Sequence, residues 1–186
     1  METYPSETVN CLMNVIGTHD TERILTVLGS SITPITEGEM SISKLSEEEL
    51  NNGIKLLKIV VLLQMTLPGI PCIYYGDEAG IEGWRDPFNR RCYPWGNENK
   101  VIMAHYLNMT EFRKKNNVLA EGKYKCLIHD KDVFVYERFD DNEKLLIAVN
   151  LSSKEITLKL NSTMSDLNNK KDKVFDVEKE SYLILK

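Results

Sequence analysis

Two neighbouring side chains near the start of the chain have types that suit binding or catalysis. A short apolar run ends at Gly17, and His19 and Asp20 follow it. An imidazole beside a carboxylate suits a substrate rich in hydroxyl groups, or a transition state that carries positive charge. The alternative is structural: Asp20 caps a helix that begins at Thr21, and His19 is a loop histidine with its hydrogen bonds satisfied. The two residues alone leave both interpretations open.

A second group of such side chains lies between positions 77 and 96. This stretch mixes acidic, basic and aromatic residues: Asp77, Glu78, Glu82, Arg85, Asp86, Arg90, Arg91, Trp84, Phe88, Tyr93 and Trp95. Flat aromatic faces and directional hydrogen bonds together match a sugar ring, which has one apolar face and a rim of hydroxyls. Long loops without regular structure are usually functional. The alternative is an internal network of ion pairs with the aromatic rings packed beneath it.

The pair Asp77–Glu78 is similar to a general acid and base, but we do not assign it that role. If the two residues continue a strand, their side chains point to opposite faces. They cannot then flank one scissile bond. One of them is expected to face the interior as a structural group.

The elements that would position these side chains form a βαβ unit. The apolar residues 10–17 predict a buried strand, and the β-branched and aromatic residues 70–75 predict a second one. Between them, Ser46 and Glu49 form a capping box at the start of an apolar-periodic helix. The two strands are therefore parallel, and ligands bind at the carboxyl edge of such sheets.

Other segments of this half complete the expected order. Residues 21–28 predict a short helix, residues 30–44 an exposed loop, and residues 101–116 a further helix.

From about position 118 the apolar period changes from helical to two. Five segments alternate or are β-branched: 122–128, 133–139, 145–150, 155–160 and 182–185. Several short strands with polar turns indicate a small antiparallel β-sandwich. The polar residues 161–172 are expected to be mobile.

Composition narrows the class of protein. The 186 residues are 42% hydrophobic and 27% charged, as in ordinary soluble globular proteins. A net charge of −5 without a stripe of Lys and Arg argues against nucleic acid as a partner. The four cysteines are widely spaced, which favours reduced packing cysteines over a zinc site or disulfides. No apolar stretch is long enough for a membrane span and residues 1–7 are unlike a signal peptide, so a cytoplasmic location is expected.

Three motifs resemble conserved segments of the α-amylase family of glycoside hydrolases. Residues 16–23 (Ile-Gly-Thr-His-Asp-Thr-Glu-Arg) are similar to its last catalytic region, and residues 67–78 to its strand 8 segment. Residues 86–91 (Asp-Pro-Phe-Asn-Arg-Arg), with Tyr93-Pro94-Trp95 after them, resemble the neopullulanase, cyclomaltodextrinase and maltogenic amylase branch. The motifs follow the family's order, and the resemblance covers nearly the whole chain.

The resemblance implies a fold class of α/β plus all-β. Residues 1–118 would be the last two βα units of a (β/α)₈ TIM barrel, and residues 119–186 a small antiparallel β-sandwich. It also implies an enzyme that cleaves α-glucosidic bonds with retention. Its partner would be an α-glucan oligosaccharide or polysaccharide, with no cofactor and no metal assigned to these residues.

Four residues match functional positions of the family. Asp20 matches the aspartate that stabilises the transition state, and His19 the histidine that hydrogen-bonds the sugar in subsite −1. Asp86 and Arg90 match residues that hold the next glucose unit on the non-reducing side.

The family's nucleophile and acid/base lie in motifs at the ends of strands 4 and 5, and neither motif occurs here. A complete barrel also takes about 250 residues. We therefore expect the chain to be the C-terminal part of such an enzyme, inactive without the missing N-terminal barrel portion. The parent's own N-terminus is then not visible, so secretion of the parent stays open. The unpaired strand edges of such a partial barrel would be sites of association. The alternative is a freestanding, non-catalytic protein that binds a glycan or a partner through the retained edge.

Overall fold

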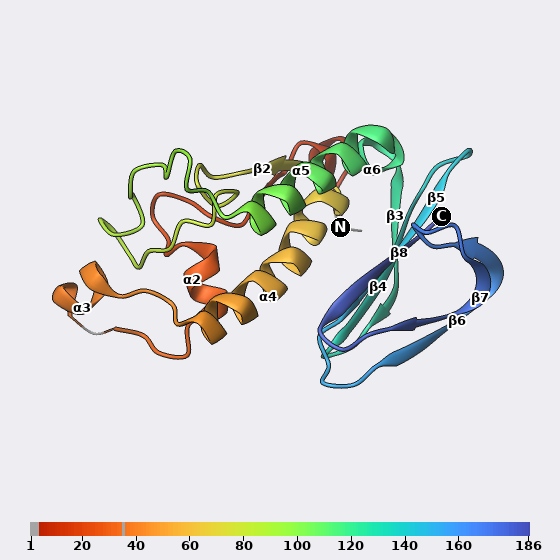
Figure 1. The fold of residues 1–186 in the computed structure, drawn as a ribbon. Coiled ribbons are helices and arrows are strands. Elements are labelled where there is room, and N and C mark those ends of the chain that lie inside the picture. Colours follow the sequence, from red (N-terminus) through yellow and green to blue (C-terminus); the bar gives the residue numbers. More distant parts are fainter. Residues whose placement is uncertain (1–3, 35) are drawn as a thin grey trace. The chain divides into compact units, whose positions relative to one another are not determined.

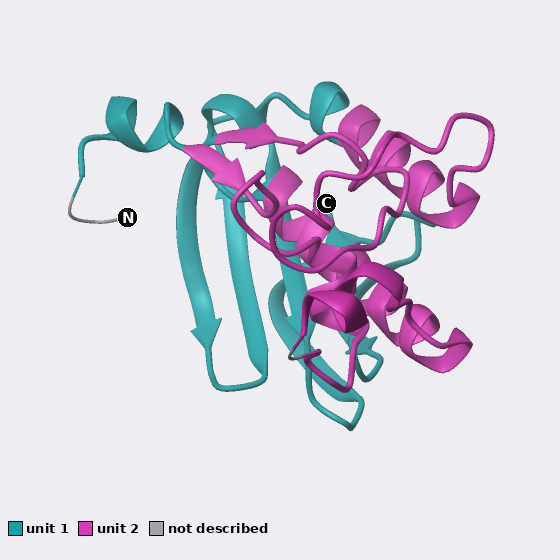
Figure 2. Ribbon diagram, turned by 90° about the vertical axis from the view of Figure 1, so that its left-hand side faces the viewer, with its two compact units in different colours: residues 1–12, 66–69, 113–186 teal, residues 13–65, 70–112 magenta. Residues whose placement is uncertain are grey.

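The computed structural model of the chain describes residues 4–34 and 36–186. The first three residues and one residue of the expected loop 30–44 lie outside this part. The chain divides into two compact units, shown in Figure 2. We call residues 13–65 and 70–112 the α/β unit, and residues 1–12, 66–69 and 113–186 the sheet unit.

The α/β unit contains the predicted βαβ order (Figure 1). Strand β1 (Met13–Val15) pairs in parallel with β2 (Ile70–Cys72), with Met13 opposite Ile70. Helix α4 (Glu47–Thr66) lies between them in the chain. Its Gln64 side chain donates to Asn14 O and Cys72 O, both at 2.9 Å, and so joins the two strands. The prediction of a parallel βαβ arrangement is therefore confirmed.

The prediction that both strands are buried is wrong, and both are shorter than the predicted ranges 10–17 and 70–75. Each strand has three residues, and Met13 is 62% exposed and Ile70 53%. The reason is that the sheet has two strands in the described part of the chain. Asn14 faces α4 through its contact with Gln64, so its neighbours Met13 and Val15 point to the opposite face. On that face Val15 is 41% exposed as well.

Two helices of the α/β unit begin at capping boxes. At α4, Ser46 Oγ accepts from Glu49 N at 3.3 Å and Glu49 Oε2 accepts from Ser46 N at 2.9 Å, as the capping box predicts. Helix α3 (Glu37–Ile42) lies within the segment expected to be a loop, which corrects that expectation. It forms because Thr36 and Glu39 make the same type of box.

Two further helices belong to this half of the chain. Helix α5 (Lys100–Lys115) confirms the prediction for 101–116 within one residue at each end. Helix α2 (Ile24–Gly29) begins three residues later than expected. Its N-cap residue is Arg23, without a side-chain capping bond, so the hypothesis that Asp20 caps this helix is wrong.

The sheet unit contains the five predicted antiparallel strands and a sixth strand, residues 171–177, that was not predicted. A four-stranded sheet has the order β3-β4-β5-β8, and β6 and β7 form a second, two-stranded sheet. The strands are β3 (Lys123–His129), β4 (Val133–Phe139), β5 (Lys144–Asn150), β6 (Ile156–Ser165), β7 (Lys171–Val177) and β8 (Ser181–Leu185). Residues from both sheets form one core, including Val135, Leu146, Leu158, Phe175 and Leu185. Two sheets therefore pack face to face over this core.

Two short helices of the sheet unit were also not predicted. Helices α1 (Ser6–Asn10) and α6 (Val118–Glu121) are each shorter than two turns. The segment 161–172, expected to be mobile, instead contains the end of β6 and the start of β7. Met164 enters the core from β6 while its neighbours are polar and outward, which explains why the stretch resembles a loop. Across the described residues, no helix has the length and apolar character needed to cross a membrane.

Candidate functional site

The residues that follow β1 form a turn stabilised by threonine hydroxyls. Thr18 N donates to Thr21 Oγ1 and Asp20 N donates to Thr18 Oγ1, both at 3.2 Å. His19 Nε2 lies 3.3 Å from Asp20 Oδ1, and their side chains are 64% and 73% exposed. The turn therefore presents an imidazole and a carboxylate, in contact with each other, to the surface of the unit.

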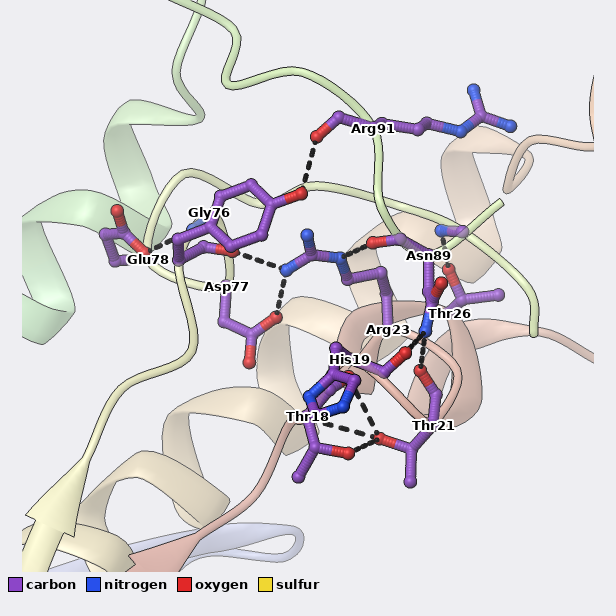
Figure 3. A network of polar contacts seen from close by, with 12 residues as sticks. Thr18, His19, Thr21, Arg23, Thr26, Gly76, Asp77, Glu78, Asn89 and Arg91 are labelled. Carbon is purple, nitrogen blue, oxygen red and sulfur yellow. Dashed lines mark hydrogen bonds and ion pairs between the residues drawn. The ribbon is translucent and has the colours of Figure 1, made fainter. Parts of the chain in front are cut away.

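The loop after β2 holds this turn through Asn89 (Figure 3). The Asn89 amide nitrogen donates to His19 O at 2.8 Å and to Thr21 O at 2.7 Å. Arg90 Nε also donates to His19 O, at 3.3 Å. The turn and the loop are thus joined by side-chain contacts, although about 70 positions separate them in sequence.

Arg90 connects the turn to Asp86. Its Nε lies 2.7 Å from Asp86 Oδ1, and both side chains are about half exposed. The contacts Asp86–Arg90, Arg90–His19 and His19–Asp20 form one continuous series. All four residues that the sequence singled out are therefore brought to one place on the α/β unit.

A buried ion pair lies beneath the exposed group. Arg23 Nη1 is 3.0 Å from Asp77 Oδ1, with each side chain 1% exposed. Arg23 Nε donates to Asn89 O at 2.6 Å and Nη1 donates to Tyr75 O. The guanidinium carbon also lies 4.4 Å and 4.6 Å from the ring centroids of Tyr74 and Tyr75. Arg23 thus contacts the loop after β2 at its start, through Tyr75, and near its middle, through Asn89.

The environment of Asp77 is set by burial and by its cation. Burial raises the pKa of Asp77 to about 6, while Arg23 acts in the opposite direction. A Cβ at position 17 would lie 2.1 Å from Asp77 Oδ2, so glycine is required there for the carboxylate to fit. Asp77 is the interior structural group expected of the pair with Glu78. It follows β2 in a turn and does not belong to the strand.

Arg23 and Asn89 were not identified from the sequence. Arg23 closes the first motif, residues 16–23, and Asn89 lies between Asp86 and Arg90. Each residue lies within one of the family motifs, and this is the sequence signal that could have identified it. Charge did not reveal either residue, because Arg side chains are usually solvated and Asn carries no charge.

The loop contains the ion pairs and packed aromatic rings of the structural alternative, and it also exposes an aromatic ring. Ion pairs and buried aromatic rings are present, since Trp84 is 7% exposed and Arg23 stacks on two tyrosines. Trp95, in contrast, is 81% exposed, with its ring centroid 4.5 Å from that of Tyr93. An exposed indole is a surface on which an apolar ring face can stack. In the described part of the chain, no three His, Cys, Asp or Glu side chains lie close enough together to hold a metal ion.

Comparisons with known proteins agree with the motifs. The family model "Alpha amylase, catalytic domain" matches residues 1–136. An amylopullulanase of Thermoanaerobacterium thermosulfurigenes is 35% identical over 165 residues, which cover 89% of this chain and 8% of that protein. A cyclomaltodextrinase of Geobacillus thermopakistaniensis is 32% identical over 157 residues, covering 82% of this chain and 23% of that protein. The chain therefore spans less than a quarter of the length of these relatives.

A solved structure supports the fold. The type III pullulan hydrolase from Thermococcus kodakarensis superposes with a TM-score of 0.76 over 97% of this chain and 30% of that one, at 24% identity. At this identity the likeness concerns the fold alone: the chain has the fold of a piece of a TIM-barrel-family protein. The resemblance inferred from the three motifs is confirmed, and the chain belongs to the α-amylase family.

Proposed function

We propose that this chain is part of a retaining glycoside hydrolase that acts on α-glucosidic bonds of starch-type polysaccharides, pullulan or cyclodextrins. In this proposal residues 1–118 supply the last two βα units of the barrel and residues 119–186 a β-sandwich domain. The observation that carries the proposal is the exposed group of His19, Asp20, Asp86 and Arg90, which a buried ion pair supports. Membership of the α-amylase family supplies the reaction class.

Asp20 is assigned to stabilise the transition state. Glycosidic bond cleavage passes through a transition state with oxocarbenium character, which carries positive charge on the sugar ring. A fixed carboxylate beside the ring stabilises that charge more than it stabilises the neutral substrate, and only this difference accelerates the reaction. Asp20 is exposed and backed by His19 at 3.3 Å, which is consistent with this role.

The other three residues are assigned to bind sugar hydroxyls. His19 would contact the ring at the cleaved bond, and Asp86 and Arg90 the next unit on the non-reducing side. Arg90 uses Nε for both Asp86 and His19 O, and in this proposal its terminal nitrogens would donate to sugar hydroxyls. A guanidinium and a carboxylate together offer donors and acceptors to adjacent hydroxyls.

The first test concerns the chain alone. The two-step mechanism needs a nucleophile and an acid/base, and no family motif in this chain supplies either. Purified chain incubated with pullulan, starch and β-cyclodextrin should release no reducing ends. A different result would be release of reducing ends by the isolated chain that Asp20→Asn abolishes. The chain would then carry its own nucleophile and acid/base, and the proposal that they lie in another part of the protein would be wrong.

The second test concerns the full-length protein that contains this chain. There Asp20→Asn should lower kcat by about 10²–10³, with KM nearly unchanged, because the lost contact acts mainly in the transition state. The matched control is Asp141→Asn, an exposed aspartate in the turn between β4 and β5, which should leave both constants unchanged. If the full-length protein binds maltooligosaccharides without cleaving them, the non-catalytic glycan-binding alternative replaces the proposal.

A further inference from the structure

We propose that Asn89 is a positioning residue that holds the carboxylate of Asp20 in place for the reaction. The proposal rests on the function given above for Asp20. Asn89 itself has no exposed surface, so it acts through the turn and not on the substrate.

The contacts of Asn89 enclose Asp20 from both sides along the chain. One amide nitrogen donates to the carbonyl of residue 19 at 2.8 Å and to that of residue 21 at 2.7 Å. Residue 20 lies between these two carbonyls, and its own N–H is held by Thr18 Oγ1. The backbone on each side of Asp20 is therefore tied to one buried side chain (Figure 3).

The chemistry of the contact requires an amide at position 89. Both partners are carbonyl oxygens, so the group facing them must donate two hydrogen bonds, which the amide NH₂ does. A carboxylate of the same shape would place oxygen against oxygen. A longer side chain has no room, since position 89 is fully buried.

Asn89 is in turn held by the buried ion pair. Arg23 Nε donates to Asn89 O at 2.6 Å, and Asp77 fixes the guanidinium from the other side at 3.0 Å. The series Asp77, Arg23, Asn89 and the turn at 18–21 connects the interior of the α/β unit to the exposed carboxylate. In this proposal the Arg23–Asp77 ion pair both stabilises the fold and fixes the position of Asp20.

The consequence is kinetic. Small displacements of a catalytic group reduce the rate strongly, by roughly 10²-fold for about 1 Å. Because Asn89 does not contact the substrate, its loss should change kcat much more than KM. In the full-length protein, Asn89→Asp should lower kcat on maltotriose roughly 10- to 100-fold while KM changes less than about 3-fold. Asn89→Ala is the second variant and should act in the same direction.

Thr26→Val is the matched control. Thr26 is buried, as Asn89 is, and its Oγ1 accepts from Gly83 N at 2.9 Å, so it joins α2 to the loop after β2. This hydrogen bond joins Thr26 to residue 83 and not to the turn at 18–21. The variant loses one buried hydrogen bond to the same loop, made from α2 instead of the turn, and should keep kcat and KM within about 2-fold of the unchanged protein.

The second measurement does not depend on activity. Hydrogen exchange of the peptide covering residues 18–23 should be faster in both Asn89 variants and unchanged in Thr26→Val. Normal kcat in both Asn89 variants overturns the proposal, as does unchanged exchange of this peptide, and so does an equal loss of kcat in Thr26→Val. A full-length protein that cleaves no α-glucan overturns the proposed function instead, and the exchange data then decide whether Asn89 holds the turn.

Discussion

Arg23 and Asp77 show how much a single buried charge depends on its partner. Each side chain is 1% exposed, so neither can be solvated if the other is removed. Breaking a buried pair on one side costs far more than the pair contributes, because an uncompensated charge remains. The exposed pair Asp86–Arg90 is the opposite case, since water solvates either residue alone.

The first prediction follows from this contrast. Asp77→Asn should lower the free energy of unfolding of the α/β unit by about 3 kcal/mol, and Asp86→Asn by less than about 1 kcal/mol. Urea unfolding followed by tryptophan fluorescence measures it, because Trp84 and Trp95 both belong to the α/β unit. Equal losses in the two variants would contradict the assignment of Asp77 as a structural anchor.

A second prediction at this scale concerns Asp86 and Arg90 in the full-length protein. If they bind a sugar one unit from the cleaved bond, they contribute equally to the ground state and the transition state. Asp86→Ala and Arg90→Ala should then raise KM for longer oligosaccharides with little change in kcat. Steady-state kinetics on maltotriose and on a minimal aryl glucoside separate the roles: equal losses on both substrates indicate a structural ion pair.

At the scale of elements, capping boxes determine where helices begin. Glu49 accepts from Ser46 N at 2.9 Å and also from Ser31 N and Oγ, at 2.8 Å and 2.6 Å. One carboxylate therefore caps α4 and attaches the segment after α2 to it. These hydrogen bonds, led by those from Ser31, lower the pKa of Glu49 from 4.5 to about 2.

Glu49 should make the stability of the folded chain depend on pH. The unfolded chain binds the proton of Glu49 at a higher pH than the folded chain does, so the contribution to stability is present above about pH 4.5 and is lost as pH falls toward about 2. Glu49→Gln should therefore have a lower urea midpoint than the unchanged chain at pH 6, and the difference should shrink below pH 4.5. Glu48→Gln, in the same helical turn, is the control. A difference that stays constant with pH would contradict the role of the charge.

At the scale of the whole molecule, the two units differ in how completely their strands are covered. In β5 all residues but the first are buried, and β5 is paired on both sides, by β4 and β8. In β1 and β2 no residue is buried, and each has one strand neighbour in the part of the chain that the structure describes. An exposed apolar strand edge is a site of association.

This contrast predicts hydrogen exchange in the isolated chain. Amides of β4 and β5 should be strongly protected, and those of β1 and β2 should exchange quickly or be protected only in associated species. Exchange measured together with size-exclusion chromatography tests this. Strong protection of Ile70–Cys72 in a demonstrated monomer would show that the two-stranded sheet is stable without further strands.

Local sequence patterns determined the parts of this protein that depend on near neighbours. The box of Ser46 and Glu49 begins α4 where expected, because its hydrogen bonds join residues three positions apart. The period-two strands from β3 to β5 and β8 appear within one or two residues of their predicted positions. The motif residues His19, Asp20, Asp86 and Arg90 lie together, as their common family implied.

Tertiary structure alone decided what depends on distant partners. Arg23 is buried because Asp77 and Asn89, 54 and 66 positions away, satisfy its charge and its hydrogen bonds. The contacts of Asn89 depend on the folded loop, which places its side-chain amide against two carbonyls of the turn. The burial of β1 could not be predicted from its apolar residues, because burial depends on which strands lie beside it. Hydrogen bonding within one turn is encoded locally, whereas desolvation is determined by everything that packs around a residue.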